Sequence, residues 1–196
     1  VYIRSTDVNR TLVSAYSNLA GMYPVGVPGV DYPGDYDKWP SKWTPIPVHT
    51  IPEDMDHIGN IFAPCPRADE LDEFIRNSSE FKQYDIEYKE FFALISQKTG
   101  KRFTFDNIHE LHDTQYIESI YNLTQPEWMT PDVVSTIRNL SRASNEFVYG
   151  ISKPYVPEMI KLRGGSMLKA LVDKMNYKIA CNQPENDNSH HCKWIQ

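Results

Sequence analysis

The segment Tyr2-Ile3-Arg4-Ser5-Thr6-Asp7-Val8-Asn9-Arg10-Thr11 decides the fold of the first part of the chain. Its β-branched and aromatic start, residues 1–3, is typical of a β-strand. Three good N-cap residues, Ser5 to Asp7, follow directly and predict that a helix begins there. Apolar residues then recur every three or four positions as far as Gly21, which favours an amphipathic helix ended by that glycine. The segment therefore predicts a strand, a turn and a helix.

Arg4 is the candidate functional residue of this segment, because it stands where the strand gives way to the helix N-terminus. The start of a helix offers unpaired backbone N–H groups and the positive end of the helix dipole, and both attract anions. The planar guanidinium of an arginine can also bind two phosphate oxygens at once. The residues alone leave a second interpretation open, in which Arg4 is structural and pairs with carbonyl groups or a neighbouring acid.

The chain changes character between residues 22 and 47, where six prolines and three glycines exclude a long helix. A short extended piece, residues 46–51, follows. Pro45 and Pro47 confine this piece to a sheet edge or to irregular structure, because proline cannot donate a hydrogen bond to a neighbouring strand.

After Cys65 the periodicity becomes helical. We expect helices over residues 68–76, 79–99, 106–120, 130–150 and from 165 onward. An aromatic stripe in the second of these is interpreted as core packing rather than as a cofactor site. The fourth helix has the clearest start, since Thr130, Pro131 and Asp132 supply an N-cap, a first-turn proline and a first-turn acid.

Composition and charge exclude several classes of protein. The chain has 196 residues, 40% of them hydrophobic, and a formal net charge of −6. This length and apolar content suit one domain, or one and a half, with a real core. The acidic balance argues against a nucleic-acid partner, which would need clustered positive charge. No window approaches the run of about 18 to 20 apolar residues that a membrane-spanning helix needs.

The cysteines and the glycosylation motifs favour a secreted or lumenal protein. Cys65, Cys181 and Cys192 make an odd count, and we expect Cys181 to pair with Cys192 across a short loop. Four Asn-x-Ser/Thr motifs are present. The best glycan candidates are Asn77 and Asn122, because each lies near a predicted break between helices. Asn139 is a further candidate, and the weakest is Asn9, which falls in the first turn of a helix.

Other motifs point only weakly to chemistry. His109 and His112 are three residues apart, whereas the metalloprotease helix needs histidines four apart, so a zinc hydrolase is a minor alternative. The cluster His190-His191-Cys192 indicates a metal only weakly. Residues 163–165 lack the further glycines and the lysine of a nucleotide-binding loop and are interpreted as a helix start. No Ser-His-Asp triad can be assigned.

Several motifs together resemble the histidine acid phosphatases. Residues 2–11 are similar to the family segment Y-I-R-S-T-D-x-x-R-T, residues 43–50 (WTPIPVHT) resemble W-x-P-I-P-V-H-T, and residues 65–67 resemble C-P-R. The Asn122 motif and Leu162-x-Gly164-Gly165 match further family positions. The resemblance spans nearly the whole chain in the family order and is closest in detail to invertebrate members of the prostatic and lysosomal type.

The resemblance implies a phosphate monoester hydrolase that works through a covalent phosphohistidine and needs no metal or other cofactor. Its nucleophile belongs to an R-H-G-x-R-x-P motif and its general acid to an H-D pair. Neither motif occurs in this sequence. Arg4 alone matches a residue of the family's phosphate pocket. We therefore expect a central segment of a longer enzyme that is inactive by itself. The alternative is a non-catalytic, truncated or binding-type member of the same fold.

The resemblance also implies the fold and the assembly. The family fold is α/β, a mixed phosphoglycerate-mutase-like sheet sandwiched by helices with a mostly helical cap inserted. Residues 1–60 and 161–196 would belong to the α/β core and 61–160 to the cap. Trp43 and His49 would lie at a homodimer contact. Ile117 replaces a cap cysteine of vertebrate members, so Cys65 would pair with a cysteine outside this chain.

Overall fold

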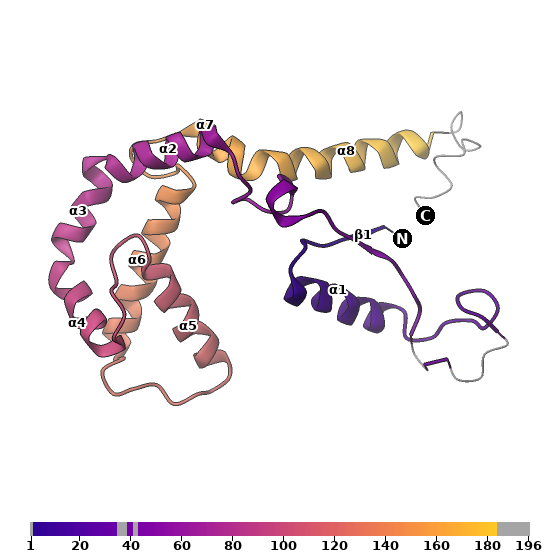
Figure 1. Ribbon diagram of the computed structural model, residues 1–196, viewed down its shortest axis with the longest axis horizontal. Helices are drawn as coiled ribbons and strands as arrows, with labels where there is room; N and C mark the ends of the chain where they lie inside the picture. The colour runs from indigo at the N-terminus through magenta and orange to yellow at the C-terminus, as the bar shows by residue number, and fades with distance from the viewer. Residues whose placement is uncertain (1, 35–38, 41–42, 184–196) are drawn as a thin grey trace. The chain divides into compact units, whose positions relative to one another are not determined.

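The computed structural model describes residues 2–34, 39–40 and 43–183. These residues form two compact units: residues 1–64 together with 164–196, and residues 65–163. Figure 1 shows the elements of both units along the chain. The assignment of the two units as α/β core and cap stays a prediction.

The first unit is built on a two-stranded parallel sheet. Strand β1, Ile3–Arg4, pairs with β2, Val48–His49, in the register Ile3 to Val48 and Arg4 to His49. The ladder is extended by the Ser5 backbone N–H, which donates to the His49 carbonyl at 2.9 Å. The extended piece expected over residues 46–51 is thus a strand of only two residues, which begins directly after Pro47.

Helix α1, Asn9–Met22, begins later than the sequence predicts. Its N-cap is Val8, which makes no side-chain cap, instead of one of the three polar residues before it. The reason is that the polar side chains are engaged elsewhere: the Thr6 hydroxyl lies 2.9 Å from the Thr11 hydroxyl, and the Ser5 hydroxyl donates to the Thr6 carbonyl at 2.9 Å. Gly21 lies inside the helix and does not end it.

The same unit contains a long irregular stretch and the last described helix. The stretch includes the 3-10 helix η1, Glu53–Met55. The helix is α8, Ser166–Cys181, and the π-helical segment before it, Lys161–Gly165, begins in the second unit. The expected helix start at residues 163–165 is therefore a π-helical turn.

The second unit is helical. Its elements are α2 Pro66–Asn77, α3 Ser79–Glu87, α4 Lys89–Thr99, α5 Ile108–Ile120, α6 Pro131–Val148 and α7 Pro157–Ile160. Helices α5 and α6 pack side by side (Figure 1). The sequence predicts one helix over residues 79–99, but the structure has two, because the backbone leaves helical geometry at Tyr88 with φ −102° and ψ 20°.

Two helix ends have the capping residues that the sequence predicts. The Thr130 side chain accepts a hydrogen bond from the Val133 N–H at 3.4 Å, as its N-cap position predicts. Gly100 ends α4 with φ +72°, in the left-handed region that favours glycine. In the described part of the chain, no helix has both the length and the apolar run needed to cross a membrane.

An aromatic cluster forms the core of the second unit. Phe105 is fully buried and stacks on Tyr84 at 4.1 Å between ring centroids. Phe81 and Phe147 meet the same ring edge-on at 5.0 and 5.7 Å. The backbone N–H of Phe105 donates to the Asp85 carboxylate at 2.8 Å. The aromatic stripe is thus core packing, as the periodicity predicts.

An exposed ion pair joins α2 to α7 within this unit. Arg67 donates from Nε and Nη2 to the two carboxylate oxygens of Glu158, at 2.9 and 2.8 Å. This fork holds the pKa of Glu158 below its usual value. A carboxyl with a lowered folded-state pKa stabilises the fold above its unfolded pKa and loses that effect as pH falls through the lowered value. The contact therefore persists into mildly acidic solution.

Candidate anion-binding site

Arg4 lies at the carboxyl end of β1, immediately before the turn that leads to α1. The side chain is 23% exposed, so solvent reaches part of it. Its Nη2 donates to Oδ1 of Asp56, 52 residues further along the chain. In the described part of the chain this is the single polar contact of the guanidinium, and Nε and Nη1 are left with their donors open.

Backbone groups of the following turn hold the carboxylate of Asp56 in place. It is 1% exposed and follows the short helix η1. Its Oδ1 also accepts from the backbone N–H groups of Ile58 and Gly59 at 3.2 and 2.8 Å, in a turn typical of aspartate. The Asp56 carbonyl accepts from the Asn60 N–H at 2.9 Å, which closes the turn. One carboxylate oxygen therefore fixes both its own loop and the arginine.

The turn packs tightly against the segment that carries Arg4. A Cβ atom added to Gly59 would lie 2.6 Å from Asp56 Oδ2 and 3.0 Å from the Thr6 methyl group. No side chain fits there without displacing the carboxylate or the segment. Asp56 Oδ2 is buried and has no hydrogen-bond partner among the described residues, and Arg4 supplies a positive charge beside the other oxygen of this carboxylate.

This geometry can bind an anion from one side. A buried carboxylate left unpaired is costly, so the pair with Arg4 is strongly favoured. A guanidinium carries five N–H donors, and Asp56 engages one of its nitrogens, which leaves a second edge able to bind two oxygens of a phosphate group. The pairing of Arg4 with an acid is thus observed, whereas its role in binding an anion stays a prediction.

Asp56 was not predicted as a functional residue from the sequence. The pattern Asp-x-x-Gly at residues 56–59 is a local signal for the turn. Nothing local signals the contact with Arg4, because the parallel pairing of β1 with β2 is what brings the two segments together.

The two histidines considered for a metal, His109 and His112, make separate contacts. His109 Nδ1 lies 3.2 Å from the Asp106 carbonyl oxygen, whereas the His112 ring stacks on Tyr116. Across the described ranges, no group of three or more His, Cys, Asp or Glu side chains is placed to hold a metal ion. The cluster at residues 190–192 lies outside the described residues.

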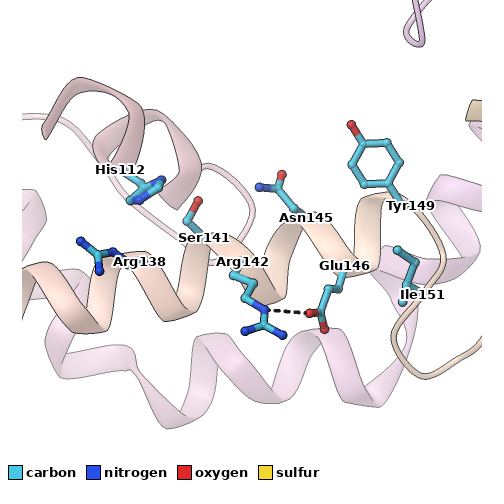
Figure 2. Close-up of a pocket in the computed structure, with 8 residues that line it drawn as sticks. All are labelled: His112, Arg138, Ser141, Arg142, Asn145, Glu146, Tyr149 and Ile151. Atoms are coloured by element: carbon cyan, nitrogen blue, oxygen red, sulfur yellow. Dashed lines mark hydrogen bonds and ion pairs between the residues drawn. The ribbon is translucent and has the colours of Figure 1, made fainter. Parts of the chain in front are cut away.

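A hollow of about 310 Å³ lies on the α5 and α6 side of the helical unit (Figure 2). Its lining includes His112, Arg138, Ser141, Arg142, Asn145, Glu146, Tyr149 and Ile151. The Arg142 Nε donates to Glu146 at 3.2 Å, which offsets one positive charge. The arginine side chain is 82% exposed, so this hollow is a shallow surface feature. Nothing joins Ser141 to His112 as a nucleophile and base among the interactions of the described residues.

The glycosylation candidates are all exposed, whereas the described cysteines are partly or wholly buried. Asn77 ends α2, Asn122 lies in the loop after α5, and Asn139 lies on α6; all three are exposed. Cys65 is a partly buried free thiol. Cys181 is buried at the end of α8, and its proposed partner Cys192 lies outside the described residues.

The two residues proposed for a dimer contact both reach the surface of the first unit. The Trp43 side chain is 43% exposed. His49 is exposed and stacks on Tyr2 at 4.8 Å.

The chain is similar to known proteins over most of its length. The model of the histidine phosphatase superfamily, branch 2, matches residues 1–192. A lysosomal acid phosphatase of Xenopus laevis is 35% identical over 188 residues, which cover 95% of this chain and 41% of that protein. The human prostatic acid phosphatase is 37% identical over 180 residues, 89% of this chain and 44% of that protein. The chain thus spans less than half the length of these relatives.

Proposed function

Because the chain belongs to branch 2 of the histidine phosphatase superfamily, we propose that it is part of an acid phosphatase that hydrolyses small phosphate monoesters through a phosphohistidine. The relatives named above are acid phosphatases by name, which supports this assignment. The observation that carries the proposal is the guanidinium of Arg4, held at a strand end by a buried carboxylate with one edge open to an anion.

Arg4 would act on the charge of the phosphoryl group. A histidine nitrogen attacks phosphorus, the alcohol leaves with a proton from the general acid, and water then releases phosphate from the phosphohistidine. The non-bridging oxygens carry negative charge throughout, and a fixed guanidinium stabilises them without reorganising. The R-H-G-x-R-x-P and H-D motifs are missing from residues 1–196, so we propose that flanking sequence supplies the nucleophile and the acid.

The proposal is tested by comparing two proteins with a chromogenic phosphate monoester at acidic pH. One is the chain of 196 residues, and the other is the complete protein, meaning this chain with the proposed flanking sequence. We expect turnover by the complete protein and none by the chain alone. Trapping of a phosphohistidine by rapid acid-free quench supports the mechanism. A complete protein that turns over no phosphate monoester would favour the binding-type alternative.

We further propose a secreted or lysosomal location. The names of the relatives support it, as do the three exposed Asn-x-Ser/Thr motifs at Asn77, Asn122 and Asn139. We expect the protein from its own cells to lose mass on enzymatic removal of N-linked glycans. An unchanged mass would argue against passage through the secretory pathway.

We propose that the complete protein is a homodimer whose contact includes Trp43 and His49. The short strand β2 ends at His49, and the exposed edge beside it is a surface that pairing of two subunits could cover. Light scattering at micromolar concentration should give twice the mass of one chain, and Trp43→Ala should shift the mass toward the monomer. A monomeric wild-type protein at that concentration rules the dimer out.

A further inference from the structure

Asp56 is the one charged residue of the described chain that is almost wholly buried, at 1% exposure. The charge of a buried carboxylate is costly unless it is paired and hydrogen-bonded. Here the pairing partner is Arg4, and two backbone N–H groups complete the contact. A buried acid that the proposed chemistry does not use directly therefore has a specific contact with the proposed phosphate-binding residue.

We infer that Asp56 is a positioning residue, which fixes the guanidinium of Arg4 in the orientation that binds the phosphoryl group. The inference rests on the proposed function. Asp56 contacts Arg4 and the backbone of residues 58–59, and in this role it acts on the reaction through Arg4. The free edge of the guanidinium is directed by the contact on its other edge, in the way that a fixed partner orients the planar fork of an arginine.

The surroundings of Asp56 show that this contact is rigid. Its Oδ1 accepts from Arg4 and from the backbone N–H groups of Ile58 and Gly59, so the carboxylate that contacts the arginine is itself held by the backbone. The close approach of Gly59 to Asp56 Oδ2 and to Thr6 leaves the carboxylate little room to move. An arginine without this contact would regain its side-chain freedom and bind phosphate in many orientations.

The inference predicts a characteristic coupling between the two residues. In the complete protein, Asp56→Ala should lower the turnover number by a factor on the order of 10 to 10², the scale for misplacing a reacting-site group by about 1 Å. In the Arg4→Ala background the same change should lower turnover little further, because the group that Asp56 positions is gone. The inhibition constant of inorganic phosphate should rise for Asp56→Ala, since the same guanidinium edge binds it.

Two further variants separate positioning from stability. Asp56→Asn keeps the size of the side chain and an acceptor for the turn, so we expect it to fold and to retain more activity than Asp56→Ala. Asp54→Ala is the matched control, because Asp54 is an exposed acid two residues away. We expect it to leave turnover and phosphate inhibition at wild-type values. Rates are compared per folded molecule, well below the unfolding temperature of each variant.

The outcomes are distinguishable. Loss of turnover by Asp56→Ala in the wild-type background, but not in the Arg4→Ala background, supports the inference. Equal losses in both backgrounds, or unchanged turnover and phosphate inhibition in folded Asp56→Ala, would show that Asp56 is merely structural while the proposed function stands. A wild-type protein without phosphatase activity overturns the proposed function, and the positioning role with it.

Discussion

Replacing Arg4 by alanine in the complete protein is expected to lower the turnover number for a phosphate monoester by on the order of 10²-fold or more, the scale for removing one fixed charge-stabilising group. The reason is geometric as well as electrostatic. Arg4 ends β1 and is fixed by Asp56, so its open edge needs no reorganisation when negative charge gathers on the phosphoryl oxygens. Steady-state kinetics over a range of substrate concentrations measures the effect.

Replacing Arg4 by lysine tests whether the positive charge alone is sufficient for turnover. Arg4→Lys keeps the positive charge but replaces a fork by a single ammonium group, so its turnover should fall between those of the wild type and Arg4→Ala. Arg138→Ala is the control, because it removes an exposed arginine from the helical unit. We expect wild-type turnover from it.

Stability has to be controlled in the same experiment, since Arg4→Ala leaves the carboxylate of Asp56 buried without its partner. The double variant Arg4→Ala with Asp56→Asn removes the unpaired charge. We expect it to recover thermal stability but not turnover. Wild-type turnover in Arg4→Ala, or recovery of turnover in the double variant, would contradict the role of Arg4 in phosphate binding.

Local sequence signals predicted the parts of the fold that local interactions decide. The strand at residues 3–4, the irregular stretch after α1 and the cap at Thr130 all depend on residues close to one another in the chain. The start of α1 was predicted too early, because the hydroxyl groups near it bind other carbonyls, and no propensity encodes that choice. The break at Tyr88 was also missed, since neither glycine nor proline marks it.

Of the two residues of the candidate site, the sequence could predict only one. Arg4 could be proposed from its place between a strand and a helix, and from the family resemblance of its segment. Asp56 could not, because its role depends on a contact with a residue 52 positions away. Such a contact exists only after β1 and β2 have paired, so it belongs to the tertiary structure and not to any window of sequence.

Phe105 belongs to the core of the helical unit, and Phe105→Ala is expected to lower the free energy of unfolding of that unit by about 3 to 5 kcal/mol. Phe105 is fully buried, stacks on Tyr84 and meets Phe81 and Phe147 edge-on. Its removal leaves a cavity and breaks three ring contacts at once. Urea unfolding monitored by the fluorescence of Trp128, which packs against this core, measures the loss.

The matched control for this prediction is Phe74→Ala, which deletes the same ring from α2 at a site where it is 58% exposed. Surface substitutions of this kind usually change stability by about 0.5 kcal/mol or less. A large difference between the two variants would place the stability of the helical unit in the cluster around Phe105. Equal losses would contradict that cluster as the core. Arg4 and Asp56 belong to the other unit. We therefore expect Phe105→Ala to lower the urea concentration at the midpoint of unfolding. Below that concentration, the contact between Arg4 and Asp56 should be retained, as measured by the coupling between their variants.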